Sequence, residues 1–340
     1  MTDKAPAGRR ANVALFVPHS GCPHQCSFCN QRAITGHAGL PTETEIRTAA
    51  ETALRTLGKD AVRAEIAFFG GSFTAIPEPY MRRMLDAAWP YVADGRFHGI
   101  RVSTRPDAID PRILDILHSR GVTAVELGAQ SMDDRVLALN GRGHTAAHVE
   151  RAAGLIKSAG LELGLQMMTG LYGDTDGGAL ETARRLLALG PDTLRIYPAI
   201  VLKGTRLAQL YRQGDYRLQT VEQAAALCGK LLRLCQAAGV PVIRLGLHDI
   251  DRDSFVAGPW HPAFREICEG GIYLEAAQKS LQNRAAGDYI LLVPKGAVSR
   301  MAGQNRRNLS ALSAAGYRCK IREDEGLSPF EIQVQEMIQP

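Results

Sequence analysis

The sequence predicts an α/β fold whose main part is a partial TIM-like (β/α)6 barrel, followed by a small C-terminal β-α-β appendix. Short, apolar, β-branched segments alternate with longer amphipathic segments from residue 12 to residue 245, which indicates parallel strands joined by helices. Cysteine and unusual polar residues follow the carboxyl ends of several successive strands. That distribution is typical of a barrel, whereas a doubly wound sheet gathers such residues at one switch point.

The elements follow from this alternation and from local start signals. Thr42 with Glu45 three residues later predicts a capped helix start, and Pro77 suits the first turn of another helix. We expect strands at 12–18, 63–69, 99–103, 122–127, 161–167, 193–197 and 240–245. We expect helices at 42–57, 77–91, 111–119, 133–159 with a break near Asn140-Gly141, 176–189 and 221–238.

The pattern changes after residue 246. A strand at 289–294, a helix at 298–315 and a strand at 317–322 make up the predicted appendix. The expected organisation is therefore a flexible N-terminal tail at 1–11, the barrel at 12–245 and the appendix at 246–340.

Composition excludes several classes of protein. The chain has 340 residues, of which 45% are hydrophobic and 22% charged, so it can bury a core. No apolar run approaches the roughly 18 residues that span a bilayer, and the polar N-terminus lacks the apolar stretch of a signal peptide. Seven cysteines are too few for a disulfide scaffold. We expect a cytoplasmic protein without a membrane partner.

Charge is unevenly distributed along the chain. The segment 279–322 carries nine Lys/Arg and one acid, whereas 323–340 carries five acids and no base. Such a basic block is typical of a surface that binds a polyanion. A solvated face opposite the acidic tail is the alternative.

The first strand is followed by three closely spaced cysteines, Cys22, Cys26 and Cys29, in a C-x3-C-x2-C pattern. Three thiolates in one loop can converge on one metal centre and leave a coordination site open, which is typical of a reactive centre. A fourth ligand from His19, His24 or His37 would instead close a structural zinc site.

The segment Cys-Pro-His-Gln-Cys-Ser-Phe-Cys, at 22–29, resembles the signature of the radical S-adenosylmethionine (SAM) superfamily. The resemblance implies that Cys22, Cys26 and Cys29 hold a 4Fe-4S cluster whose fourth iron is chelated by SAM. Reduction of the cluster would then cleave SAM to methionine and a 5′-deoxyadenosyl radical, which abstracts a substrate hydrogen. The barrel would be of the radical SAM type.

Further motifs closely resemble the radical-SAM domain of the Elongator catalytic subunit and its bacterial relatives, and more distantly oxygen-independent coproporphyrinogen III oxidase. The likeness implies that Gly70-Gly71 meets the SAM amino group, that Ser103 and Gln130 contact its ribose or methionine part, and that Arg142 pairs with its carboxylate. Gln166 stands where the oxidase has a ribose-binding Asp, and the likeness therefore also assigns Gln166 to SAM binding, although the residue type departs from the pattern of the oxidase. No substrate-contacting catalytic residue is assigned.

Structural interpretations compete with some of these assignments. Arg142 could be a surface arginine that caps a helix, and His144 is interpreted as structural. Glu126 either binds substrate or pairs with Arg105 or Arg142. The remaining cysteines, Cys228, Cys235, Cys268 and Cys319, are interpreted as buried structural thiols rather than a second cluster.

The functional hypothesis is a radical SAM enzyme that modifies an RNA, a tRNA or an rRNA, and takes its electron from an external donor of the flavodoxin or ferredoxin type. The residues expected to contact RNA are Lys279, Arg284, Lys295, Arg300, Arg306 and Arg307. Two alternatives are a small-molecule substrate such as a tetrapyrrole, and a non-catalytic zinc-stabilised RNA-binding protein. The 95 residues after the barrel are too few for both the appendix and an acetyltransferase domain like that of the Elongator subunit, so acetyl-CoA use stays open.

Overall fold

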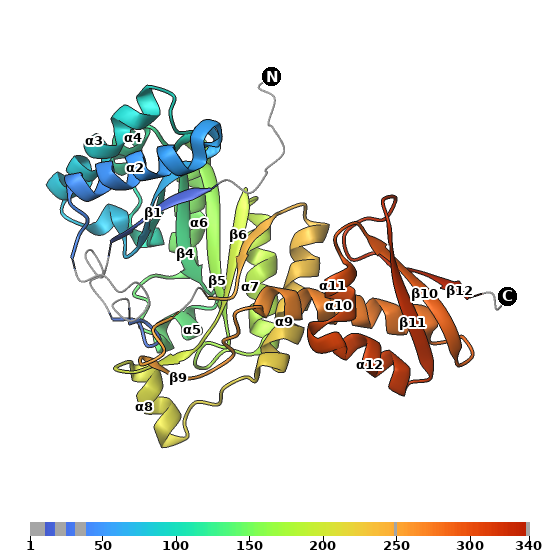
Figure 1. The fold of residues 1–340 in the computed structure, drawn as a ribbon. Coiled ribbons are helices and arrows are strands. Elements are labelled where there is room, and N and C mark those ends of the chain that lie inside the picture. Colours follow the sequence, from blue (N-terminus) through green and yellow to red (C-terminus); the bar gives the residue numbers. More distant parts are fainter. Residues whose placement is uncertain (1–10, 18–24, 31–38, 248–249, 338–340) are drawn as a thin grey trace. The chain divides into compact units, whose positions relative to one another are not determined.

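The computed structural model describes residues 11–17, 25–30, 39–247 and 250–337. Its main sheet has seven strands, all parallel, that follow one another in the order β1-β2-β3-β4-β5-β6-β8 (Figure 1). The strands are β1 (Asn12–Val17), β2 (Glu65–Gly70), β3 (Gly99–Thr104), β4 (Val122–Gln130), β5 (Glu162–Thr169), β6 (Thr193–Pro198) and β8 (Val242–Leu245). Because β1 and β8 are the two edges and do not pair, the barrel is partial, as predicted.

Helices connect these strands. They are α2 (Glu43–Leu57), α3 (Glu78–Ala93), α4 (Pro111–His118), α5 (Asp134–Leu139), α6 (Ala146–Ser158), α7 (Asp176–Ala188), α8 (Arg206–Gln213) and α9 (Val221–Ala237). The capping box at Thr42 is confirmed, since its side chain accepts from the Glu45 N–H while the Glu45 carboxylate accepts from the Thr42 N–H. The predicted break at Asn140-Gly141 separates α5 from α6. No helix in the described ranges is long and apolar enough to cross a membrane.

Parallel pairing brings the carboxyl ends of all seven strands to one edge of the sheet. The end of β4 departs from regular geometry there. Its register against β5 shifts between Gly128 and Gln130, and Gln130 has a φ of 67°, in the left-handed region. A bulge of this kind redirects the side chains at a strand end.

The chain forms two compact units. One comprises residues 1–218 and 234–258, and the other comprises 219–233 and 259–340. The first contains the main sheet and a short antiparallel pair, β7 (Val201–Leu202) with β9 (Phe255–Ala257). The second contains a three-stranded sheet in the order β11-β10-β12.

The second unit contains more elements than the predicted β-α-β appendix, and it includes residues 219–233, which the sequence had assigned to the barrel. Its elements are α10 (Phe264–Leu281), β10 (Gly287–Pro294), α11 (Val298–Ala302), α12 (Arg307–Ala314), β11 (Tyr317–Asp324) and β12 (Gln333–Glu336). Strand β10 pairs parallel with β11, as a β-α-β unit requires, and antiparallel with β12, which we did not predict. The single helix expected at 298–315 was wrong. Helix α11 ends at Ala302, where Gly303 follows with a φ of 74°, and Asn305 and Arg306 have φ values of 50° and 60°, which a right-handed helix cannot contain.

Candidate active site

The cysteine loop follows β1, and residues 25–30 of it are described. Cys26 is 7% exposed and Cys29 is half-buried, and the Cys29 N–H donates to the Cys26 carbonyl at 3.1 Å. Cys22 and the alternative ligands His19, His24 and His37 lie outside the described residues.

Residue Ser27, between the two described cysteines, fixes this loop against the end of α5. The Ser27 N–H donates to the Asn140 carbonyl at 3.0 Å, and its hydroxyl donates to Asn140 Oδ1 at 2.6 Å. The Ser27 carbonyl accepts from the N–H of Leu207 in α8 at 2.8 Å. Both Cys26 and Cys29 are therefore held at the carboxyl edge of the sheet, where the sequence placed the reactive centre.

Arg142 is the residue that joins the cysteine loop to the sheet. Its Nη1 donates to Cys26 Sγ at 3.1 Å, and its Nη2 donates to the Gly128 carbonyl at 2.6 Å. The residue is 7% exposed, so the alternative of a surface arginine was wrong. Gly128 leaves room beside it, because a Cβ there would lie 3.4 Å from Arg142 Nη2 and 3.0 Å from Gln130 Nε2, and these side chains would have to shift.

Arg105 in turn holds Arg142. Its guanidinium makes two hydrogen bonds of 2.9 Å to the Asp107 carboxylate, and its Nη2 also donates to the Arg142 carbonyl at 2.8 Å. The sequence offered Arg105 as a partner for Glu126, and the structure pairs it with Asp107 instead.

Gln130 and Arg142 each present a polar atom that no described residue satisfies. Gln130 Oε1 and Arg142 Nε are buried and form no hydrogen bond within the described part of the chain. A buried acceptor and a buried cationic donor without partners are costly unless a ligand pairs with them. The left-handed φ of Gln130 adds strain of the kind that accumulates at functional sites.

His144 contributes to structure, as expected. Its Nε2 lies 3.2 Å from the Ala129 carbonyl, and the ring is buried. Burial, together with the nearby Arg142 cation, lowers the pKa of His144 to about 4. The ring is therefore neutral at pH 7.

Glu126 is the centre of a buried polar cluster on the inner face of the main sheet. It is 1% exposed and forms a two-point ion pair with Arg195 of β6, at 2.9 and 2.8 Å. Arg101 of β3 lies 3.5 Å away, and Arg101 also pairs with Glu65 at 2.7 Å. The sequence had offered Arg105 or Arg142 as the partner of Glu126. The true partners were missed because the lateral neighbour of a strand residue depends on sheet register.

Ser103 and Gln166, expected to contact SAM, belong to this same cluster. Gln166 Nε2 donates to Glu126 Oε2 at 2.8 Å and lies 3.3 Å from Ser103 Oγ, and Ser103 Oγ donates to Glu126 at 3.4 Å. The structure thus brings together residues from β3, β4 and β5. Gly164 on β5 makes room for Glu126, because a Cβ at Gly164 would lie 2.7 Å from Glu126 Cγ.

Gly70 and Gly71 connect β2 to the end of β1. The φ of Gly70 is 104°, and the Gly71 N–H donates to the Val17 carbonyl at 2.6 Å. A Cβ on Gly70 would lie 3.3 Å from that carbonyl oxygen. Glycine is required at position 70 by the backbone conformation itself.

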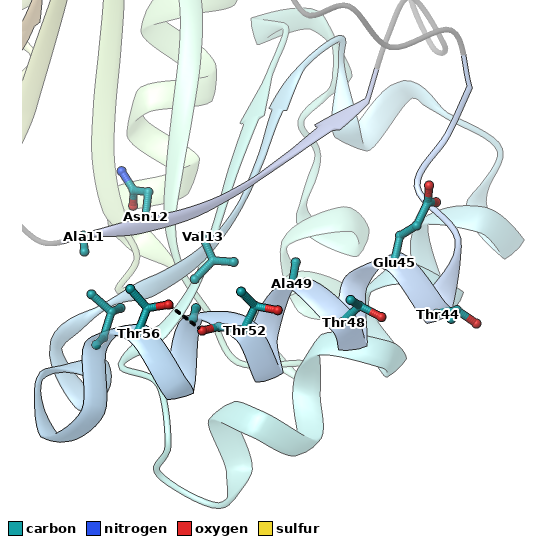
Figure 2. A pocket seen from close by; sticks show the side chains of 11 residues that line it. Ala11, Asn12, Val13, Thr44, Glu45, Thr48, Ala49, Thr52 and Thr56 are labelled. Carbon is teal, nitrogen blue, oxygen red and sulfur yellow. Dashed lines mark hydrogen bonds between the residues drawn. The ribbon is translucent and has the colours of Figure 1, made fainter.

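A separate hollow of about 600 Å³ lies between α2 and the amino end of β1 (Figure 2). Thr48, Thr52 and Thr56 line it along one side of α2, and Thr56 Oγ1 bonds the carbonyl of Thr52. Its one ionisable lining group, Glu45, is occupied in the capping box. None of the candidate site residues that the structure describes lines this hollow, and its lining offers no evident chemistry.

Of the four remaining cysteines, expected to be buried, three are buried and Cys319 is half-buried. Cys228, Cys235 and Cys268 are buried, and burial raises the pKa of the Cys235 thiol to about 11. Burial and the neighbouring Cys228 raise the pKa of Cys268 further. Protonated thiols are poor metal ligands. No cluster of three potential metal-ligating side chains occurs among the residues with described positions.

The basic block of the second unit is partly neutralised. Lys295 pairs with Glu325 at 2.7 Å, Arg284 with Glu336 at 3.7 Å, and Arg300 with Glu269 at 3.0 Å. The acidic tail supplies two of these partners, so the interpretation of a solvated face opposite the tail holds for Lys295 and Arg284. Lys279, Arg306 and Arg307 form no ion pair within the described ranges, and all three are exposed.

Comparison with known proteins adds to this geometry. The sequence profile of the Radical SAM superfamily matches residues 16–186, and that of the Radical_SAM C-terminal domain matches residues 191–273. The tRNA uridine(34) acetyltransferase of Dehalococcoides mccartyi is 27% identical over 237 residues, covering 60% of this chain and 52% of that protein. Elongator complex protein 3 of Homo sapiens is 28% identical over 201 residues, covering 53% and 37%.

An archaeal solved structure shares the fold. The Elp3 of Methanocaldococcus infernus, with its N-terminus deleted, has a TM-score of 0.61 at 20% identity, covering 83% of this chain and 66% of that one. The chain spans about half the length of the acetyltransferase and about a third of Elongator complex protein 3.

Proposed function

The chain belongs to the radical SAM superfamily and is a radical SAM enzyme, and on this basis we propose that it cleaves SAM reductively to modify an RNA. The cluster would be held by Cys22, Cys26 and Cys29. The observation that carries the proposal is the contact between the Arg142 guanidinium and the Cys26 thiol, which places a cation for the SAM carboxylate directly beside a cluster ligand.

The residues present fit this cofactor pair. Cys26 and Cys29 supply soft sulfur ligands from one fixed loop, and Gln130 and Arg142 supply an unpartnered acceptor and an unpartnered donor. When bound, a 4Fe-4S cluster supplies the electron that splits SAM into methionine and the 5′-deoxyadenosyl radical.

The protein's own part is to bind and orient. We assign the SAM carboxylate to Arg142, which Arg105 keeps in place through the Arg142 carbonyl. Gln130 Oε1 suits a ribose hydroxyl, because an amide oxygen accepts where a hydroxyl donates. The backbone of Gly70-Gly71 is assigned to the amino group of SAM. Ser103 and Gln166, tied to Glu126, line the same region and are assigned to its ribose or methionine part.

Two observations support the proposal of an RNA substrate. The matched relatives include a tRNA uridine(34) acetyltransferase, and the second unit carries a dense basic block. We propose a tRNA or rRNA base as the target and an external flavodoxin- or ferredoxin-type protein as the electron donor.

The decisive experiment is anaerobic reconstitution with iron and sulfide, followed by addition of SAM and dithionite and assay of 5′-deoxyadenosine. The reconstituted wild type should form 5′-deoxyadenosine. The Cys26→Ala variant should lose at least about 100-fold of this activity and most of its bound iron, because two thiolates do not secure the cluster.

Cys235→Ala is the matched control, since Cys235 is buried and lies outside the loop. It should retain iron and activity. A wild-type protein that takes up zinc and no iron would overturn the enzymatic proposal and favour the zinc-stabilised alternative.

A further inference from the structure

The sheet of the second unit has one face that its helices do not cover. Side chains alternate along a strand, so residues two apart share a face. On β11, Arg318, Lys320 and Arg322 are exposed, whereas Tyr317, Cys319 and Ile321 are half-buried. The register places Asp288, Ile290 and Leu292 of β10 beside the three basic residues, and Gln335 and Gln333 of β12 beside Ile290 and Leu292. We call these eight residues the outer sheet face.

The opposite face forms the core of the unit. Tyr289, Leu291 and Val293 of β10 pack against a cluster that includes Tyr273, Ala277 and Leu281 of α10. Met301 of α11 and Leu312 of α12 belong to the same cluster, and Figure 1 shows these helices beside the sheet. Because α10, α11 and α12 all use that side, Arg318, Lys320 and Arg322 are left exposed on the outer sheet face, whereas Ile290 is half-buried and Leu292 is buried between the flanking strands.

Positive charge on the outer sheet face is only partly neutralised. Arg318 is held by Asp288 through two hydrogen bonds, at 2.7 and 2.6 Å. Lys320 and Arg322 form no ion pair with an acid among the residues the structure places. Of the basic block, Lys295, Arg284 and Arg300 already have acidic partners. The free positive charge thus lies partly on β11, on residues other than those that sequence alone had singled out.

We propose that the outer sheet face binds the phosphate backbone of the RNA substrate, with Lys320 and Arg322 as the phosphate contacts. This inference rests on the proposed RNA-modifying function. Side chains two apart on a strand are separated by about 7 Å, a spacing comparable with that of successive phosphates along a nucleic acid strand. Gln333 and Gln335 add uncharged donors on the far side of β10.

The residue composition of the outer sheet face predicts whether RNA binding depends on base sequence. None of its eight residues is aromatic, so bases have no ring to stack on, and contacts to phosphate carry no sequence information. Binding through this face should therefore depend steeply on salt and weakly on sequence.

The test measures the binding of unfractionated tRNA to the 340-residue chain. Fluorescence anisotropy reports the binding, and the measurement is repeated across a range of salt concentrations. Lys320→Gln/Arg322→Gln should weaken binding about tenfold and reduce the magnitude of the slope of log K against log salt by about 1 to 2, since two phosphate contacts are removed. Both side chains are exposed, and circular dichroism checks that the fold is retained.

Two further variants complete the design. Arg47→Gln/Arg55→Gln on α2 removes the same charge from the other unit and should bind as the wild type does. Arg306→Gln/Arg307→Gln removes the exposed pair at the start of α12 and should have the smaller effect of the two second-unit variants. The reverse order would overturn the assignment to the outer sheet face.

The remaining outcomes separate this inference from the function it rests on. If the wild type binds tRNA and the β11 variant binds equally tightly, the inference fails and the RNA substrate stands. If the wild type binds no tRNA, both fail, whereas the cysteine-dependent cleavage of SAM is judged by its own assay. Binding of polyglutamate instead, lost on the same substitutions, would reassign the face to an acidic protein and overturn the inference.

Discussion

At the scale of single residues, Arg142 determines the character of the site. Its guanidinium bridges Cys26 of the cysteine loop and the Gly128 carbonyl at the end of β4, and its Nε is left without a partner in the described part of the chain. A planar fork of donors suits these simultaneous contacts, and a lysine ammonium does not reproduce them.

Arg142→Lys should therefore weaken SAM binding by about 10- to 100-fold, the cost of losing a charge-assisted hydrogen bond. The measurement is the dissociation constant for SAM on the reconstituted enzyme, with iron content determined in parallel. Unchanged SAM affinity at full iron content would remove Arg142 from the binding site.

His144 predicts a pH dependence of stability. Its folded pKa of about 4 lies below the 6.5 of a free histidine. Below pH 6.5 His144 becomes protonated in the unfolded chain but stays neutral in the folded protein. The free energy of unfolding therefore falls as the pH falls toward 4. At pH 5 this contribution amounts to about 2 kcal/mol.

Urea unfolding at pH 7.5 and pH 5 measures this effect. The loss of stability between the two values should be about 2 kcal/mol smaller in His144→Gln than in the wild type. Equal losses in both proteins would show that His144 titrates normally in the folded state.

At the scale of elements, the packing of β4 against β5 depends on a glycine. Gly164→Ala would place a Cβ 2.7 Å from Glu126 Cγ and 3.2 Å from Thr193 Oγ1, and Glu126 could move only by breaking its pair with Arg195. We expect a destabilisation of about 1 to 3 kcal/mol by chemical denaturation.

Gly154→Ala is the control for this substitution. Gly154 lies in the exposed part of α6 with nothing within 4 Å of an added Cβ, so alanine should stabilise the protein by about 0.5 to 1 kcal/mol. Equal effects of the two substitutions would argue against the close packing of Glu126.

At the scale of the whole molecule, the cysteine loop and the basic block lie in different units. The first carries the cysteine loop and the strand ends around it, and the second carries the basic block. A net charge of +5 says little about this division, because the acidic tail neutralises part of the block locally. The predicted salt dependence of tRNA binding belongs at this scale, since it reports the positive charge that remains after internal pairing.

Much of the fold could be predicted because its signals are local. The βα alternation, the capping box at Thr42 and the break at Asn140-Gly141 depend on residues close in sequence, and each is confirmed. Strand β12 was missed because Gln-Val-Gln-Glu has little apolar content and becomes a strand only by pairing with β10. The interruption after α11 was missed although Gly303 is a local signal for a helix end, whereas the left-handed conformations of Asn305 and Arg306 carry no glycine signal.

The sequence alone determined the family and located the cysteine loop, because both depend on motifs of fixed spacing. Only the tertiary structure decided which side chains meet. Glu126 pairs with Arg195 rather than Arg105, and Arg142 reaches Cys26 across 116 positions of sequence. The tertiary structure also decided which of the described basic residues have no acidic partner. The physical reason is that pairing between charges depends on strand register and burial, which no local pattern encodes.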